Sequence, residues 1–322
     1  MNQAVLQIRD LSVSYRTEQG PLQALRQVSL AVPPGKIVGI VGESGCGKST
    51  LIAAIIRLLA PNARIDSGAI VFQGRNLLGL SAEEMRALRG NQISMVFQDP
   101  MSSLNPVLTI GRQMADVQHR SRSGRGKKNA RSLMMLERVG ISDPASQLRR
   151  YPHHLSGGMR QRVAIAMALM SEPALLIADE PTTALDATLE VQIIQRLKEL
   201  QRDFGCSILF ISHHLGVIAE LCDEVIVMYA GEVCESGPMR EVFLTPRHPY
   251  TQRLLECDPA RIRQRTRQLP VIEGSLPSLI ELPRGCIFRE RCGHSFERCG
   301  IERPRLSGDA HQSACHLSDT AS

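Results

Sequence analysis

The chain has 322 residues, enough for one large domain and a smaller appendage. Hydrophobic residues make up 43% of it, which allows a sizeable buried core and argues against disorder. Aromatic residues are only 3% and Trp is absent, which argues against base-stacking modules, so we expect no nucleic-acid partner. The net charge of +6 suits anionic ligands or a lipid surface without identifying either.

Neither a membrane span nor a secretion signal is visible in the sequence. A spanning helix needs roughly 18 consecutive apolar residues, whereas the apolar run at residues 163–170 has eight. Arg9 and Asp10 lie where a signal peptide needs its apolar stretch. We therefore expect an intracellular protein whose membrane role depends on partners.

Short apolar segments alternate with helical ones, which is the pattern of a sheet flanked by helices. We expect strands at residues 6–13, 36–41, 69–72, 93–97, 174–178 and 207–211, and helices at 49–59, 160–170 and 188–204. The early alternating segments suit an antiparallel sheet, and helix dominates from about 99 to 151. Within that stretch, residues 120–128 form a basic loop, read as solvated, with contact to anionic lipid headgroups as the alternative.

The most specific motif follows the strand at 36–41 and opens a helix. Residues 42–49 read G-E-S-G-C-G-K-S, which fits the P-loop pattern G-x-x-x-x-G-K-[ST]. Its glycines let backbone N–H groups turn inward and hold phosphate oxygens at a helix N-terminus. The residues expected to bind nucleotide here are Gly42, Glu43, Ser44, Gly45, Cys46, Gly47, Lys48, Ser49 and Thr50.

Within this loop, Lys48 should reach the β- and γ-phosphates, and Ser49 should place its hydroxyl on Mg²⁺. The thiol of Cys46 is read as filling a variable position, with redox control as the alternative. Downstream, an apolar strand ends in two acids, Asp179 and Glu180. Asp179 can hold Mg²⁺ through water, and Glu180 can orient or deprotonate the attacking water.

Further motifs resemble those of the ATP-binding cassette (ABC) ATPases. Residues 155–162, L-S-G-G-M-R-Q-R, resemble the signature motif, and residues 183–186, T-A-L-D, resemble the D-loop. Residues 97–100 resemble the Q-loop, and residues 211–213 the switch-histidine segment. Tyr15 stands where the family stacks an aromatic ring on adenine. The resemblance covers about residues 5–255 in the family's order.

The resemblance implies specific roles at the ATP site. Glu180, His213 and Gln98 are expected to act in catalysis, and Ser49, Gln98 and Asp179 to surround Mg²⁺. Ser156, Gly157 and Gly158 are expected to contact ATP held by the opposite subunit of a dimer, so one chain carries only half-sites. His214 stands directly after the switch histidine, where the family commonly has Asp. This difference bears on the fine tuning of His213 and leaves its expected role unchanged.

The C-terminal part resembles one branch of this family. Residues 247–251, R-H-P-Y-T, resemble the segment that follows the cassette in oligopeptide, dipeptide and nickel importers. Cys286, Cys292, Cys299 and Cys315 resemble the extension of the D-type peptide-importer subunit, in which four cysteines bind a [4Fe–4S] cluster. The residues alone also allow Zn²⁺, with His294, His311 and His316 nearby, while disulfides are disfavoured inside the cell.

These observations predict an α/β protein of the P-loop NTPase (ABC ATPase) type, with an antiparallel β subdomain, a helical subdomain and a small C-terminal extension. We expect a nucleotide-binding domain at residues 1–257, its helical subdomain at about 99–165, and the extension at 258–322. The resemblance implies that ATP and Mg²⁺ drive import of peptides or similar small polar solutes, with the individual solute left open.

The implied partners are two transmembrane permease subunits and a second ATP-binding subunit, which would form a heterodimer with this chain. An extracytoplasmic solute-binding protein would act indirectly. The chain would then be peripheral to the inner membrane, at its cytoplasmic face. Two alternatives are a soluble ABC ATPase of a non-transport machine and a non-catalytic scaffold. The single P-loop argues against the two-cassette soluble type, and the full set of catalytic positions argues against the scaffold.

Overall fold

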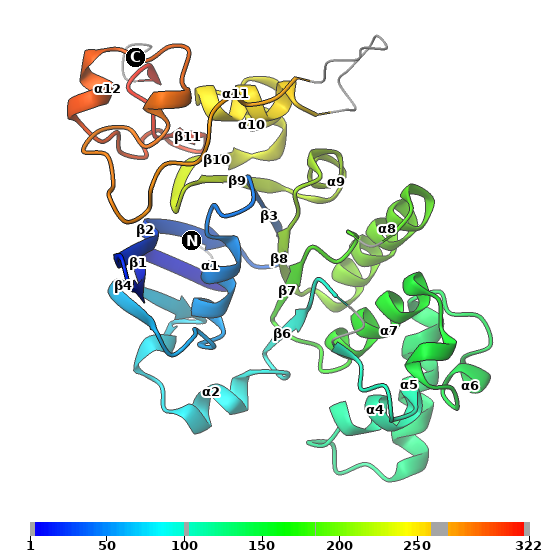
Figure 1. Cartoon of the computed structure of the whole chain (residues 1–322). Coiled ribbons are helices and arrows are strands. Elements are labelled where there is room, and N and C mark those ends of the chain that lie inside the picture. The colour runs from blue at the N-terminus through cyan, green and yellow to red at the C-terminus, as the bar shows by residue number, and fades with distance from the viewer. Residues whose placement is uncertain (1–3, 100–102, 184, 259–269, 319–322) are drawn as a thin grey trace. The chain divides into compact units, whose positions relative to one another are not determined.

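The computed structural model describes residues 4–99, 103–183, 185–258 and 270–318. The chain separates into two compact units. The first combines Met1–Leu80 with Ile211–Ser322, and the second is Ser81–Phe210. In Figure 1 the first unit runs from dark blue to light blue and then from yellow to red, whereas the second is mainly cyan and green.

An antiparallel sheet opens the first unit and confirms the predicted antiparallel subdomain. Its strands, in the order β2-β1-β4-β5, are β2 (Gly20–Val32), β1 (Leu6–Thr17), β4 (Ala63–Phe72) and β5 (Arg75–Asn76). Alternate side chains of β1 such as Leu6 and Ile8 are fully buried, because successive residues of a strand point to opposite faces. Strand β1 continues past the predicted end at residue 13 to Thr17, so Tyr15 lies on a strand.

A second group of strands in the first unit leads to the P-loop. Strand β3 (Ile37–Val41) is parallel to β9 (Glu224–Tyr229), which pairs antiparallel with β10 (Glu232–Pro238), and β10 pairs with β11 (Gln312–Ser313). Every residue of β3 is buried, as its unbroken apolar run predicts. Helix α1 (Lys48–Ile55) follows the loop and ends before the predicted residue 59, because Arg57 adopts a left-handed φ of 52°.

The remaining short helices of the first unit lie in its C-terminal half, except the 3-10 turn at Leu77–Gly79. They are α9 (Leu215–Leu221), α10 (Met239–Leu244), α11 (Pro249–Glu256), the 3-10 turn at Arg289–Arg291, and α12 (Glu297–Ile301).

The C-terminal extension is packed onto this unit through an aromatic cluster, in which the centroid of the Phe288 ring lies 5.1 Å from that of Tyr229 and 5.4 Å from that of Tyr250. Strand β11 adds to β10 at the edge, so the extension is part of the unit's structure.

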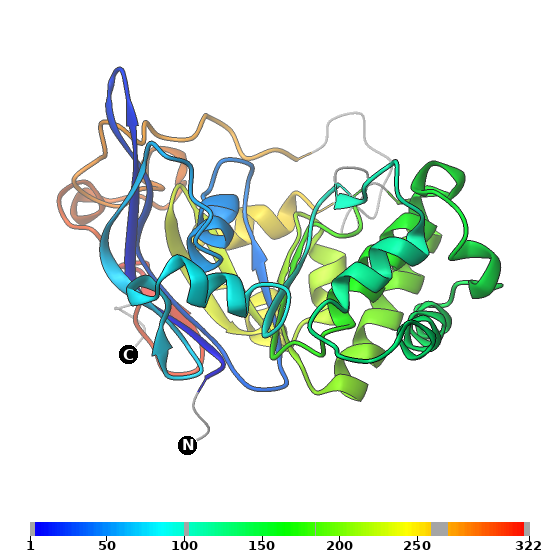
Figure 2. The same cartoon turned by 90° about the horizontal axis from the view of Figure 1, so that it is seen from below.

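The second unit combines parallel strands with a group of helices. Strand β6 (Ile93–Val96) is parallel to β7 (Leu175–Asp179), and β8 (Ser207–Ile211) follows in the order β8-β7-β6. Its helices are α2 (Ala82–Leu88), α4 (Ile110–Val117), α5 (Arg125–Arg138), α6 (Pro144–Gln147), α7 (Gly157–Leu169) and α8 (Ala187–Phe204), with a 3-10 turn at Pro152–His154. Figure 2 shows α4 to α7 grouped together in green.

The predicted α/β class is confirmed, with both parallel and antiparallel strand pairs. The helix-rich stretch predicted from about 99 to 151 contains α4, α5 and α6.

Across the residues that the structure describes, no helix combines the length and apolarity needed to cross a membrane. Arg261, Arg263, Arg265 and Arg267 alternate with mostly polar residues, a composition that indicates a linker, and they lie outside the described residues. The predicted domain boundaries stay predictions.

One buried carboxylate joins the extension to the rest of the first unit. Glu235 on β10 has a side chain with 0% exposure. It accepts hydrogen bonds from the backbone N–H groups of Arg247 and His248, at 2.7 and 3.0 Å. The Nε2 atom of His311 lies 2.6 Å from the same carboxylate. Removing this acceptor leaves these three donors without it, and two of them belong to the buried residues His248 and His311.

We therefore expect Glu235→Ala to lower the free energy of unfolding by about 3 kcal/mol, the usual cost of breaking a buried polar network. Chemical denaturation of the full chain measures this difference. The exposed Glu281 provides the control, because Glu281→Ala should leave the free energy of unfolding within about 0.5 kcal/mol. Equal effects of the two substitutions would show that the Glu235 network does not hold the extension in place.

Candidate functional site

The phosphate-binding loop predicted at residues 42–49 lies between β3 and α1. Gly42 and Gly47 have φ values of 155° and 104°, which L-residues with side chains rarely adopt. A Cβ atom on Gly42 would lie 2.1 Å from the Met228 carbonyl oxygen, and one on Gly47 would lie 2.8 Å from that of Ala24. These glycines let the loop pack directly on neighbouring backbone while Ser44, Gly45 and Ser49 remain exposed.

Lys48 begins α1 and folds back over the loop. Its Nζ atom donates to the carbonyl oxygens of Gly42 at 2.6 Å and Glu43 at 3.1 Å. Helix α1 has no acidic residue in its first turn, so its N-terminus is electrostatically favourable for an anion. The loop therefore presents a cationic amine and a helix N-terminus together, the arrangement that binds phosphate.

Two further predicted residues are Tyr15, which lies beside this loop, and Cys46, which lies within it. The hydroxyl of Tyr15 on β1 lies 3.2 Å from that of Thr50 on α1. Cys46 is fully buried, and burial raises the pKa of its thiol. A buried thiol of raised pKa forms little thiolate, which favours the reading of Cys46 as a packing residue over redox control.

His213 also belongs to the first unit. It follows β8 and is exposed, with its ring centroid 4.6 Å from that of His214. The preceding residue, Ser212, donates its backbone N–H to the Ile40 carbonyl at 3.3 Å. Ile40 lies two residues before Gly42, so the fold brings the histidine pair to the same strand end as the P-loop.

In the second unit, the predicted residues Gln98 and Glu180 meet Thr183 at the ends of β6 and β7. Parallel pairing of Val96 with Ala178 brings the carboxyl ends of these strands together. Gln98 Nε2 donates to Glu180 Oε2 at 3.0 Å, and Thr183 Oγ1 donates to the same oxygen at 3.0 Å. Two donors thus fix the carboxylate of the proposed base, as positioning for water activation requires.

Glu180 has a left-handed backbone, with a φ of 45°. Such a conformation costs a non-glycine residue about 1–3 kcal/mol and is concentrated at functional sites. It turns the chain sharply after Asp179, the last residue of β7. Pro100 of the Q-loop and Ala184 of the D-loop lie outside the described residues.

The signature residues form the N-terminus of α7. Ser156 is the N-cap residue, and its Oγ accepts the Met159 N–H at 3.3 Å. Ser156 and Gly157 are exposed, and Gly158 is buried against Leu189. No acidic residue occurs in the first turn of α7, so this exposed helix end can receive an anion.

All four cysteines of the extension line one pocket. Cys286, Cys292, Cys299 and Cys315 share it with His294 and His316. Burial raises the pKa of Cys286 to about 12, and the other three cysteines contribute to the shift. All nine cysteines of the chain are free thiols. Among the described residues, no group of three or more His, Cys, Asp or Glu side chains is arranged to hold a metal ion.

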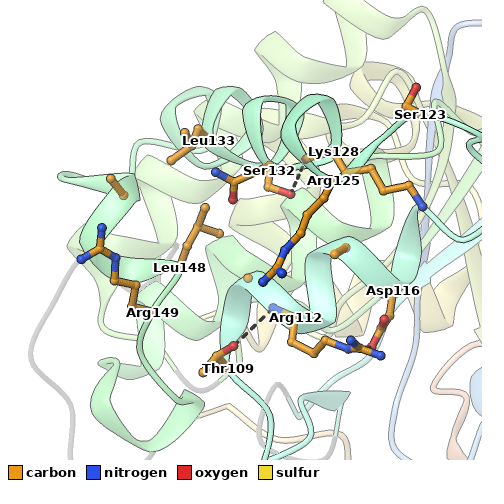
Figure 3. A pocket seen from close by; sticks show the side chains of 14 residues that line it. Thr109, Arg112, Asp116, Ser123, Arg125, Lys128, Ser132, Leu133, Leu148 and Arg149 are labelled. Carbon is orange, nitrogen blue, oxygen red and sulfur yellow. Dashed lines mark hydrogen bonds and ion pairs between the residues drawn. The ribbon is translucent and has the colours of Figure 1, made fainter.

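A separate basic pocket of about 750 Å³ lies among α4, α5 and α6 in the second unit. Figure 3 shows Arg125 extending from α5 toward α4, where Arg112 pairs with Asp116 at 3.1 Å. Lys128 and Arg149 also line it. The pocket contains none of the predicted nucleotide-binding residues, and it belongs partly to the basic segment at 120–128.

Sequence reasoning missed three residues around the P-loop, Arg291, Tyr229 and Tyr250. Arg291 Nη1 lies 2.7 Å from Glu43 Oε2, and Tyr250 accepts the Glu43 N–H at 3.0 Å. Hydrogen bonding to Glu43 raises the pKa of the Arg291 guanidinium above its ordinary value. One signal in the sequence could have indicated them. Glu43 is an acidic residue inside a phosphate-binding loop, and its charge predicts a compensating cation elsewhere in the chain.

The close approach at Gly42 yields a direct test. Gly42→Ala forces a methyl group against the Met228 carbonyl, so the loop must shift, and we expect ATP binding to weaken by at least about a hundredfold. Gly79→Ala is the control, because no atom lies within 4 Å of the added methyl group. Calorimetric titration of both full-length variants with Mg²⁺-ATP measures the difference. Unchanged affinity in Gly42→Ala would contradict a phosphate site at this loop.

Comparison with known proteins agrees with this geometry. The family model described as ABC transporter matches residues 25–183. A second model, described as oligopeptide/dipeptide transporter, C-terminal region, matches residues 234–299. Among solved structures, the dimeric post-hydrolysis state of the ATP-binding cassette MJ0796 bound to ADP and Pi is similar, with a TM-score of 0.66 and 28% identity. That match covers 73% of this chain and 99% of the other.

Relatives of known name are similar over nearly their whole length. The chain is 47% identical to the probable peptide ABC transporter ATP-binding protein y4tR of Sinorhizobium fredii, covering 98% of this chain and 95% of the relative. It is 46% identical to the dipeptide transport ATP-binding protein DppD of Bacillus subtilis, with coverage of 98% and 95%. Identity to the oligopeptide transport ATP-binding protein OppD of Salmonella typhimurium is 45%, with coverage of 93% and 89%. The chain therefore belongs to the ABC transporter family, as an ATP-hydrolysing subunit of its oligopeptide/dipeptide importer branch.

Proposed function

We propose that this chain hydrolyses ATP to drive import of peptides or similar small polar solutes. The observation that carries the hydrolytic part is the Glu180 carboxylate, which Gln98 and Thr183 hold at 3.0 Å each beside the end of β7. The match of residues 234–299 to the oligopeptide/dipeptide C-terminal region supports the solute class. A soluble ABC ATPase has no comparable support.

In the proposed reaction, each predicted residue has a defined task. Lys48 and the loop N–H groups bind the β- and γ-phosphates. Ser49, Gln98 and Asp179 are the residues that would hold Mg²⁺, which would neutralise charge on the phosphates. Tyr15 stacks on the adenine. Water attacks the γ-phosphorus, the bond to the β,γ-bridging oxygen breaks, and ADP leaves. Glu180 orients the water and accepts its proton, and His213 holds the γ-phosphate in line.

We further propose that the exposed N-terminus of α7 serves the ATP of a second subunit. Ser156 and Gly157 are exposed in the single chain, as an intermolecular role requires. The partner would be a second ATP-binding subunit, which makes a heterodimer, and two permease subunits would cross the membrane. The chain would lie at the cytoplasmic face, and an extracytoplasmic binding protein would select the solute.

Replacing Glu180 tests the catalytic assignment. Glu180→Gln keeps the size of the side chain and removes its basicity, so we expect the ATPase rate to fall by about a hundredfold or more. ATP should still bind, and the dimer should accumulate in size-exclusion chromatography because hydrolysis no longer opens it. Glu137→Gln, on the exposed side of α5, is the matched control. Full turnover in Glu180→Gln would remove this residue from the role of base.

Reconstitution tests the transport assignment. The chain, assembled with the permease subunits and second cassette proposed as its partners, should support ATP-dependent peptide uptake into proteoliposomes, and Glu180→Gln should abolish that uptake. Association of the chain with ribosomes and not with membranes would favour the soluble alternative.

We also propose that Cys286, Cys292, Cys299 and Cys315 hold a [4Fe–4S] cluster. Their shared pocket supports a common ligand, and four cysteine thiolates are the usual ligands of such a cluster. Zn²⁺ is the alternative ligand, with His294 or His316 of the same pocket completing its coordination, whereas His311 is engaged by Glu235 at 2.6 Å. The role would be structural, as a cross-link in an extension too small for a large core.

Metal analysis decides between these ligands. We expect anaerobically purified protein to contain about four iron and four sulfide per chain, with broad visible absorption. Cys299→Ser should lose the iron, whereas Cys206→Ser, a buried cysteine that does not line this pocket, should retain it. Stoichiometric zinc without iron would overturn the proposal.

A further inference from the structure

An acidic side chain occupies the second position of the phosphate-binding loop. Glu43 directly follows Gly42, and its side chain is 29% exposed. A carboxylate at this place repels the phosphates that the loop binds, because like charges a few ångströms apart interact strongly where water is partly excluded. The loop therefore needs a compensating cation close to Glu43.

Arg291, in the C-terminal extension, supplies that cation. Its Nη1 donates to Glu43 Oε2 at 2.7 Å and its Nη2 to Glu43 Oε1 at 3.0 Å, which is a bidentate pair. Only 5% of the Arg291 side chain is exposed. The pair lies in the first unit, and its two members are separated by 248 residues in the sequence.

The other donors of this guanidinium are also satisfied. Nη1 contacts the Tyr229 hydroxyl at 3.3 Å, Nη2 donates to the Ile272 carbonyl at 2.8 Å, and Nε donates to the Glu273 carbonyl at 2.8 Å. Because each nitrogen of its guanidinium group has an acceptor, Arg291 holds the Glu43 carboxylate in one position. The segment that it anchors also approaches the loop at a second point, where a Cβ on Gly45 would lie 3.3 Å from Leu276 Cδ1.

The backbone of Glu43 is tied to the P-loop lysine. Its carbonyl accepts from Lys48 Nζ at 3.1 Å, and its N–H donates to the Tyr250 hydroxyl at 3.0 Å. The position of Glu43 therefore affects the amine expected to reach the phosphates. A displaced or uncompensated Glu43 carboxylate could also attract that amine away from them.

We propose that Arg291 is a positioning residue for ATP, which neutralises Glu43 and holds it against the C-terminal extension so that the loop and Lys48 remain free to bind phosphate. The extension is then part of the nucleotide site. This inference rests on the proposed binding of ATP at residues 42–49.

The test measures the affinity of nucleotide-free, full-length protein for a fluorescent ATP analogue with Mg²⁺. Arg291→Met removes the charge and keeps the bulk, so we expect the Kd to rise about tenfold, the usual size of a lost charge-assisted hydrogen bond. Arg291→Lys keeps the charge and should raise the Kd only about threefold. Adding Glu43→Gln to Arg291→Met should return the Kd to within about threefold of wild type, because the repulsive charge is gone.

Arg303 provides a matched control within the same extension. Its Nε lies 3.1 Å from Glu232 Oε2 and its Nη1 donates to Gln27 Oε1 at 2.7 Å, so it also anchors the tail. Arg303→Met should leave the Kd within about twofold of wild type even if it lowers the melting temperature. Hydrogen exchange of residues 42–49 should accelerate in Arg291→Met and not in Arg303→Met, provided that both variants remain folded by circular dichroism.

The outcomes separate this inference from the proposed function. If wild type binds ATP and Lys48→Ala does not, the site is established. Equal Kd values for wild type and Arg291→Met then overturn the role of Arg291 alone. So do equal losses in Arg291→Met and Arg303→Met, or a failure of Glu43→Gln to restore binding. If wild type itself binds no ATP, the proposed function and this inference fall together.

Discussion

A loop that binds phosphate must keep backbone N–H groups turned toward a space that protein atoms leave open. It therefore cannot be stabilised by its own hydrogen bonds alone. In this chain the surroundings supply the stability. Gly42 and Gly47 pack against the backbone of residues 228 and 24, and Gly231 donates its N–H to the Cys46 carbonyl at 3.0 Å. The loop geometry consequently depends on strands β2 and β9 and on the turn that leads into β10.

Each unit places its polar groups by the same principle. Parallel strands end at a common edge, and the loops that follow collect functional side chains there. In the first unit β3 leads to Lys48, and in the second unit β6 and β7 lead to Gln98 and Glu180. The strand order thus explains how residues distant in sequence, such as 98 and 180, become hydrogen-bonded partners.

Much of the candidate site could be predicted because its chemistry lies within short segments. The spacing at 42–49, the acids at 179–180 and the glycines at 157–158 are local features, and their secondary-structure contexts agree with the prediction. Family resemblance added Tyr15, Gln98 and His213, whose isolated residue types carry little information. The α/β class followed from the alternation of apolar strands and helices.

Other features depend on packing and were not readable from local sequence. The left-handed Arg57 shortens α1, although the residues up to 59 are compatible with a helix. The left-handed conformation of Glu180 depends on its surroundings, since glutamate has no intrinsic preference for it. The pairings of Arg291 with Glu43 and of His311 with Glu235 join segments far apart in the chain.

The nucleotide motifs all end before the C-terminal extension begins. The phosphate-binding loop nevertheless depends on Arg291, which lies in that extension. A gene fusion or exchange that breaks the chain near residue 257 would transfer every nucleotide motif intact, yet it would separate an acid from its counter-ion. The transferable unit of this cassette is therefore longer than its motifs, and an exchanged C-terminal segment must bring a cation that reaches Glu43.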